Sequence, residues 1–558
     1  MRADVTAASL LLLFALSTIG LVCLTVVLWH ALRRARAAER EAASRTEQLE
    51  QELARHQSAG EEWSQEERFR TPLERAEDYT IFLLDPTGRP TSWNSSVRRV
   101  LGYERPEFLR LSAADLYTAD LRAAGVTTML VSDHPHLFET GGENYHTDFG
   151  GWDYVRGHEG DPWRTHVDTS WVGTPAPPAR DGGWFYRKLW GDGLSIDRAY
   201  DRTRTWFRAE QDYPGPRTMA AAADWLRRAA PQHDRWLLFV DEFDPHEPFD
   251  TPPPWLGRYE DEPWDGELVI WPPYVVGGVS KGYITEAEGR HVRANYGAKL
   301  SMIDHWFGEM TAALDEGGLW DSTAVVVCTD HGHYLGDMRG GDDIWGKPGA
   351  PQYEPLGHMP LLVHWPGVPG GGSCDALTTS VDLHATLADV FGVVPRHRTH
   401  GRSLVPLLAG TAPSVREWAI GGVWGNWVQV TDGRRKYARA PVAGNRPLSM
   451  WSNRWSTMPL HVAGVQELPV PDHRATLDFM PGSTVPVIRQ PFAPGDRLPF
   501  WAGTRPVPSH LYDLDVDPDE GENRAEEPRA ARAMVDLLRS ALDEVEAPAE
   551  QYARLGLT

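Results

Sequence analysis

The stretch WLLFVDEFDPHEPF, residues Trp236–Phe249, joins an apolar run of strand length to a cluster of polar side chains. The run Trp236–Val240 is continuously apolar rather than alternating, which is typical of a strand buried on both faces of a parallel sheet. Asp241, Asp244 and His246 follow shortly after the run ends. The stretch therefore predicts a central strand that ends in groups able to bind ions or move protons.

Further apolar runs of the same character occur on both sides of this one, at Thr127–Val131, Ala324–Thr329 and Pro360–His364. We interpret all of them as buried parallel strands. Helices are predicted between them at Met219–Ala230 and Tyr296–Leu314, the second with apolar residues at three-to-four spacing. This alternation predicts an α/β fold with a doubly wound, mainly parallel sheet flanked by helices.

Asp and His residues follow three of the predicted strands, at Ser132–His136, Asp241–His246 and Asp330–His333. In an open parallel sheet ligands bind beyond the carboxyl ends of the strands, so we expect these residues to meet at one edge. Carboxylate oxygens suit a hard cation such as Ca²⁺ or Mg²⁺. Lys347, in the stretch IWGKPGAP, suits an anionic oxygen. The pattern predicts a site for a cation and an anion.

Beyond this pattern, the region from about Leu121 to Asn523 resembles the sulfatases of the alkaline phosphatase superfamily. The motifs that carry the resemblance are TDHGHYLGD (329–337), DPHEPF (244–249), VSDHPHLF (131–138), IWGKPGAPQYEPLGHMPLLVHWPG (344–367), GRSLVPLLAG (401–410) and HLYDLDVDPDEGEN (510–523). The resemblance implies an α/β core over residues 121–410, followed by a small C-terminal subdomain and tail over residues 411–558.

The resemblance also implies roles for individual residues. Asp330 and His331 match the metal ligands of the family, and the cation expected there is Ca²⁺. His136, His246 and Lys347 match family residues that contact the sulfate ester or take part in its hydrolysis. In VSDHPHLF the lysine of the family pattern is replaced, with Asp133 and His134 nearby. The implied substrate is a sulfate ester of a small molecule, saccharide or aryl alcohol.

Two parts of the family pattern are missing from this sequence. Sulfatases use a formylglycine nucleophile made from Cys or Ser in the pattern C/S-x-P-x-R, and none of Cys23, Cys328 and Cys374, nor any Ser, fits it. The Asp pair that follows the first strand of the family is also absent. We therefore expect weak calcium binding and little or no sulfatase turnover. A metal-dependent phosphoesterase of the same superfamily is an alternative reading.

The N-terminal part predicts a membrane anchor. Residues 7–29 carry no charge and are long enough to span a bilayer as a helix, so residues 1–30 are predicted to be transmembrane. The arginines that follow place the C-terminal bulk in the cytoplasm by the positive-inside rule: Arg33, Arg34, Arg36 and Arg40. Residues 31–74 have helix composition, and either a dimeric coiled coil, which would make a homodimer, or a single solvated helix fits their broken heptads.

Residues 75–120 resemble the opening of a PAS sensory domain, through the hairpin pattern IFLLDPTGRPTSWN (81–94) and the LGY at Leu101–Tyr103. This is a partial α+β segment, about half of a PAS domain. It supports a second reading, a membrane-anchored sensor or binding protein with a non-catalytic sulfatase-like region. The formal net charge of −23 over 558 residues argues against a nucleic-acid partner.

Overall fold

The computed structural model describes residues 118–138, 145–170, 195–266, 268–348, 350–395, 398–452, 471–479, 486–496, 498 and 508–558. All of them belong to one compact unit of the chain. The predicted transmembrane helix, the helical linker and nearly all of the PAS-like segment lie outside the described residues. Among the residues that are described, no helix is long and apolar enough to cross a membrane.

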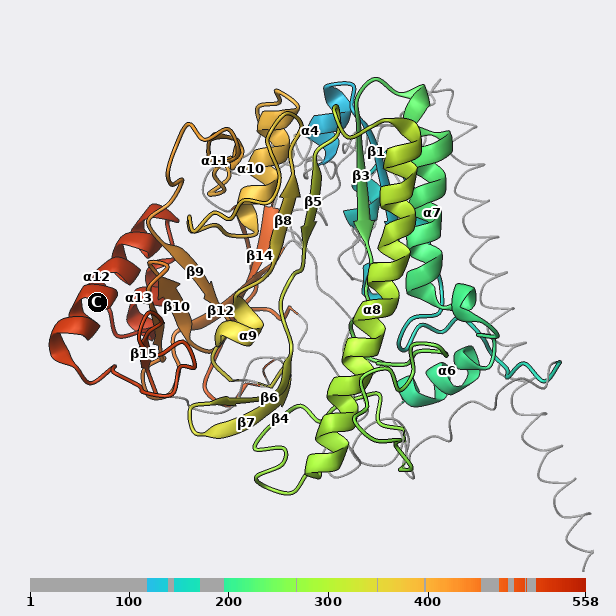
Figure 1. Cartoon of the computed structure of the whole chain (residues 1–558). Helices are drawn as coiled ribbons and strands as arrows, with labels where there is room; N and C mark the ends of the chain where they lie inside the picture. The colour runs from blue at the N-terminus through green and yellow to red at the C-terminus, as the bar shows by residue number, and fades with distance from the viewer. Residues whose placement is uncertain are drawn as a thin grey trace, which may run out of the picture. The chain divides into compact units, whose positions relative to one another are not determined.

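A three-stranded parallel sheet contains the apolar run Trp236–Val240 (Figure 1). Its order is β2 (Gly151–Tyr154), β1 (Thr127–Ser132) and β3 (Trp236–Asp241). β1 pairs in parallel with both neighbours, so that Val131 lies opposite Val240. The predicted α/β class with a parallel sheet is confirmed here, and the carboxyl ends of β1 and β3 lie side by side.

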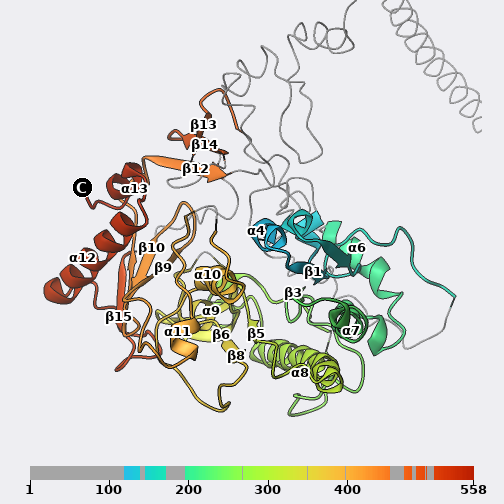
Figure 2. The same cartoon turned by 90° about the horizontal axis from the view of Figure 1, so that it is seen from above.

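Two long helices, α7 (Pro214–Arg228) and α8 (Glu286–Gly317), pack against each other along this sheet (Figure 2). Both predicted helices are confirmed and extend further toward the N-terminus than expected. α8 begins with a capping box, in which the Thr285 side chain accepts from the backbone N–H of Glu288. It ends at Gly318, whose positive φ of 60° suits glycine. Apolar residues of the two helices cover Trp236 and Leu238 of β3.

The strands β5 (Val325–Cys328) and β8 (Leu361–His364) are correctly placed, but the prediction that they are buried and parallel is wrong. They pair with each other in antiparallel register as a separate two-stranded sheet. Within the described residues, β3 pairs only with β1 and β5 only with β8, so both present an unpaired edge. Leu362 of β8 is 60% exposed. An apolar run predicts where a strand lies and how long it is. It does not predict the direction of the strand, which depends on pairing partners elsewhere in the chain.

A small antiparallel sheet carries the Lys347 loop. Its order is β4 (Val275–Val276), β7 (Asp342–Gly346) and β6 (Tyr334–Arg339). Trp345 of β7 is buried in the largest apolar cluster of the described residues, beside Phe249 and Trp271. This packing fixes the backbone directly before Lys347.

The C-terminal part is antiparallel. One sheet has the order β15 (His510–Asp513), β11 (Arg435–Arg439), β10 (Val428–Thr431) and β9 (Ala419–Gly422), and α12 (Pro528–Glu544) packs on it. Another has the order β12 (Leu448–Ser452), β14 (Pro486–Phe492) and β13 (Thr476–Phe479). The remaining elements are α4 (Thr118–Ala123), η2 (Pro135–Phe138), η3 (Tyr145–Asp148), α6 (Ser195–Arg204), η4 (Glu210–Asp212), η5 (Ala230–Gln232), α9 (Glu354–Gly357), α10 (Val381–Val390), α11 (Val405–Leu408) and α13 (Ala549–Arg554). The subdomain boundary at residue 410 stays a prediction.

Candidate functional site

The carboxyl ends of β1 and β3 are joined by hydrogen bonds between their polar endings. The backbone N–H of Phe243 donates to Asp133 Oδ1 at 2.8 Å, and Ser132 Oγ donates to Asp241 Oδ2 at 3.1 Å. Parallel pairing in register brings these residues together, because both strands end at the same level of the sheet. The expectation that these two strands deliver Asp and His to one edge is confirmed.

Phe243 is the centre of a cluster of imidazole rings. The rings of His134 and His246 stack on it, with centroids 4.6 and 4.3 Å away. The ring of His158 meets it edge-on at 4.7 Å, and that of His136 lies 5.9 Å away. Phe243, which follows β3, thus contacts four histidines that come from three chain segments, after β1, β2 and β3.

His136 lies on η2 and forms an ion-pair contact with Glu159, with 3.3 Å between Nε2 and Oε2. Burial alone would raise the pKa of Glu159, but the hydrogen bond and charge of His136, with His246 and His158 nearby, lower it to about 2. Glu159 also has a positive φ of 44°, which is uncommon for a residue with a side chain. Sequence reasoning found His136 and missed Glu159.

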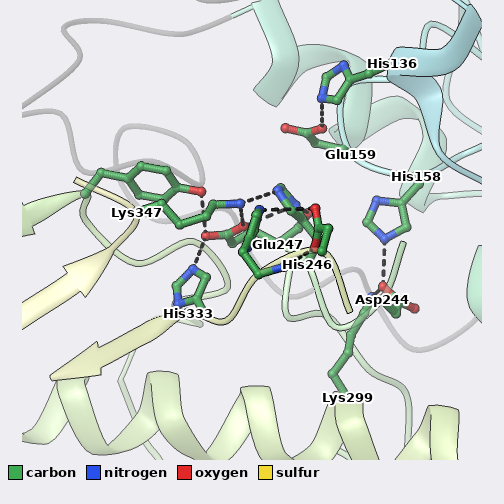
Figure 3. A network of polar contacts seen from close by, with 12 residues as sticks. His136, His158, Glu159, Asp244, His246, Glu247, Lys299, His333 and Lys347 are labelled. Atoms are coloured by element: carbon green, nitrogen blue, oxygen red, sulfur yellow. Dashed lines mark hydrogen bonds and ion pairs between the residues drawn. The ribbon is translucent and has the colours of Figure 1, made fainter. Parts of the chain in front are cut away.

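His246 and Lys347 are in direct contact, although 101 positions separate them (Figure 3). Lys347 Nζ donates to His246 Nε2 at 2.8 Å, and His246 Nδ1 faces the backbone oxygen of Glu247 at 2.9 Å. Burial, together with the charge of Lys347, lowers the pKa of His246 to about 3. The ring is therefore neutral at pH 7 and carries its proton on Nδ1, which leaves Nε2 as an acceptor.

Glu247, which sequence reasoning also missed, lies beneath this pair with its carboxylate fully buried. Burial would raise its pKa, but His246, Lys347 and His333 outweigh burial and hold the pKa well below its usual range. Its position next to His246 in DPHEPF was the available signal, because an acidic residue beside a functional histidine commonly orients it.

A second buried network lies beside the first. Lys299 of α8 contacts Asp244 Oδ1 at 2.7 Å, and His158 Nε2 approaches the same oxygen at 2.7 Å. Burial would raise the pKa of Asp244, but these two partners lower it. Burial and the neighbouring charge of Asp244 raise the pKa of Asp133 well above its usual range. The signal for Lys299 was a lysine within the apolar face of a predicted helix.

The structure places Asp330 and His331 together after β5. The Asp330 carboxylate accepts from the backbone N–H of His331 at 2.8 Å, and its side chain is 79% exposed. Burial, followed by the charge of Lys347, lowers the pKa of His331. Because β5 belongs to a separate two-stranded sheet, the expectation that all three strand endings meet at one edge of a parallel sheet is not confirmed.

The implied cofactors do not fit the residues that the structure describes. Calcium takes six to eight oxygen ligands. No group of three or more His, Cys, Asp or Glu side chains in the described ranges is arranged to hold a metal ion. Cys328 and Cys374 are exposed and lie outside the C/S-x-P-x-R pattern, so neither supplies a formylglycine. We therefore derive no catalytic step through a metal or an aldehyde.

Gly332 holds the Asp330–His331 turn against α9. A Cβ atom at this position would collide with the backbone oxygen of Pro355, and the backbone N–H of Gly332 donates to Leu356 O at 2.9 Å. We expect Gly332→Ala to lower the free energy of unfolding by about 1–3 kcal/mol, because neither backbone can yield cheaply. Gly370→Ala is the matched control, because its φ, like that of Gly332, is not positive and nothing lies near a Cβ there. Urea unfolding of both variants measures the difference, and equal losses would contradict this account.

Comparisons with known proteins show similarity to sulfatases. The family described as Sulfatase matches residues 140–393. Choline-sulfatase of Rhizobium meliloti is 28% identical over 224 residues, which cover 36% of this chain and 41% of that protein. Arylsulfatase K of Xenopus laevis is 27% identical over 260 residues, 46% of this chain and 38% of that protein. Among solved structures, the phosphonate monoester hydrolase SpPMH from Silicibacter pomeroyi is 18% identical with a TM-score of 0.48, covering 82% of this chain and 84% of that chain.

The chain spans about two fifths or less of the length of these curated relatives. Residues 140–393, which the family model matches, contain DPHEPF and TDHGHYLGD together with the contact between His246 and Lys347. This part of the chain is therefore similar to the sulfatases.

Proposed function

We propose that the described part of the chain binds the sulfate group of a sulfuric ester at Lys347 and His246, in a chain with little or no sulfatase turnover. The observation that carries the proposal is the 2.8 Å contact between Lys347 Nζ and His246 Nε2 inside the sulfatase-family segment. An ammonium has three N–H groups, and His246 takes one of them. The other two are available for the oxygens of an anion.

The remaining predicted residues have places around this anion subsite. His136, paired with Glu159, is proposed to face the alcohol side of the ester. Asp330 and His331, the metal ligands that the resemblance implies, are only two ligands, whereas Ca²⁺ takes six to eight. The substrate class is a small-molecule, saccharide or aryl sulfate, which the names choline-sulfatase and arylsulfatase K of the relatives support.

The absence of the formylglycine pattern leads us to expect binding without hydrolysis. Covalent catalysis of the sulfatase type cannot proceed without its nucleophile. We expect 4-nitrophenyl sulfate to be hydrolysed at the background rate by the full chain with Ca²⁺ present. Fast hydrolysis that disappears in Lys347→Ala would contradict this expectation. Hydrolysis of 4-nitrophenyl phosphate instead would favour the phosphoesterase reading.

Lys347→Ala tests the anion subsite itself. Charge-assisted hydrogen bonds contribute about 1.5–3 kcal/mol, so we expect the variant to bind inorganic sulfate about 10–100-fold more weakly. Lys281→Ala is the matched control, because Lys281 forms a 3.0 Å ion pair at the surface with Asp342, the first residue of β7. Isothermal titration of the full chain with sulfate measures both variants. Equal sulfate affinity in the wild type and in Lys347→Ala would contradict the proposal.

A further inference from the structure

The Glu247 carboxylate gathers side chains from three other segments of the chain. His333 Nε2, at the start of β6, donates to Oε1 at 2.6 Å. Tyr274 OH, before β4, donates to the same oxygen at 2.8 Å. Oε1 of Glu247 is therefore held by donors from two other segments of the chain.

The other oxygen faces the two residues of the subsite. Oε2 lies 3.1 Å from His246 Nδ1 and 3.9 Å from Lys347 Nζ (Figure 3). Oε2 accepts no hydrogen bond from the described residues, so its attraction to these two groups is that of an ion pair. A completely buried carboxylate is costly unless such partners compensate its charge. The Lys347 ammonium also lies 5.8 Å from the Tyr274 ring.

We propose that Glu247 is the positioning residue of the anion subsite: it holds the His246 ring and the Lys347 ammonium in the arrangement that receives a sulfate group. This inference rests on the proposed function, because it assigns a role within that same subsite. Glu247 acts through His246 and Lys347.

Two effects of Glu247 on a bound anion have opposite signs, and this makes the inference testable. Its negative charge repels sulfate through space, so a role as a mere nearby charge predicts tighter sulfate binding in Glu247→Gln. Positioning predicts weaker binding in the same variant. Glutamine keeps the shape but has a single accepting oxygen. Its NH₂ group is a donor and cannot accept from the N–H or O–H groups that it faces. Those groups would then no longer be held in place.

The experiment is an isothermal titration of the full chain with inorganic sulfate. We expect Glu247→Gln to bind sulfate at least about tenfold more weakly, while Tyr274→Phe, which loses one contact, weakens binding less than about threefold. Glu247→Asp keeps the charge on a shorter side chain and should recover part of the affinity lost in Glu247→Gln. Unchanged or tighter binding in Glu247→Gln would overturn the inference.

Controls separate positioning from stability. Glu520→Gln changes another fully buried carboxylate, which pairs with Lys436 Nζ at 2.5 Å in the C-terminal part, and should leave sulfate affinity unchanged. Weakening in Glu520→Gln equal to that in Glu247→Gln would count against positioning. If Glu247→Gln does not fold, sulfate affinity in Glu247→Asp equal to wild type overturns the inference.

The two proposals can fail separately. Wild-type protein that binds no sulfate would refute the subsite, and the role of Glu247 with it. Binding that is lost in Lys347→Ala yet intact in Glu247→Gln would refute the role of Glu247 alone.

Discussion

Lys299→Met is expected to lower the free energy of unfolding by about 3–5 kcal/mol, since it removes one partner of a buried ion pair and leaves the other charged. The Lys299 side chain is 2% exposed, and that of Asp244 is fully buried. Lys299 also donates to the backbone oxygen of Asp250 at 3.5 Å. The substitution would therefore remove the contacts of Lys299 of α8 with Asp244 and Asp250, in the loop that carries His246. Urea unfolding of the full chain measures the loss.

The double variant Lys299→Met with Asp244→Asn shows whether the buried charge is the cause. Asparagine removes the charge that methionine leaves uncompensated, so the double variant should recover part of the stability lost in Lys299→Met. Arg228→Met on the surface of α7 is a matched control, because its ion pair with Asp224 is exposed and such pairs contribute about 0–1 kcal/mol. A loss below 1 kcal/mol in Lys299→Met would contradict the account.

Trp345→Ala should cost about 3–5 kcal/mol, the range for deleting a large buried aromatic side chain. Trp345 is 1% exposed, and its Nε1 donates to Asp343 Oδ2 at 2.7 Å. Its ring fills the space beside Gly278, Gly289 and Gly336, where a Cβ atom would meet the indole at each position. Because Trp345 precedes Lys347 by two residues, we also expect weaker sulfate binding.

Trp345→Phe is the matched control for this cavity. Phenylalanine fills much of the space but leaves Asp343 without the indole donor, so the expected loss is smaller, about 1–3 kcal/mol. Urea unfolding gives both losses, and sulfate titration reports on Lys347. If Trp345→Ala were as stable as Trp345→Phe, the ring would not be filling a cavity.

Much of the fold could be predicted from local patterns. The four apolar runs became β1, β3, β5 and β8, and the helical periodicity of Tyr296–Leu314 lies within α8. Strand direction could not be predicted for β5 and β8, because a continuous apolar run is the same in parallel and antiparallel pairing. The exposure of Leu362 could not be predicted either, since exposure depends on what packs on the face of the sheet.

The sequence predicted several residues of the site, but it did not predict which of their side chains are in contact. His246 and Lys347 were found separately, one from a strand ending and the other from a loop of glycine and proline. Nothing in the local sequence says that their side chains meet. Glu247 and Glu159 were missed because an acidic residue on the printed sequence is most often a solvated charge. Their burial among histidines and a lysine gives them their chemistry.

The sequence by itself determined where the strands and helices form, and that Asp and His residues follow β1, β3 and β5. It could do so because hydrophobic periodicity and turn chemistry act over a few residues. Tertiary structure alone decided which ionisable groups meet, which are buried, and therefore which carry a charge. Those properties arise from segments about a hundred positions apart, such as His246 and Lys347, being packed together where water is excluded.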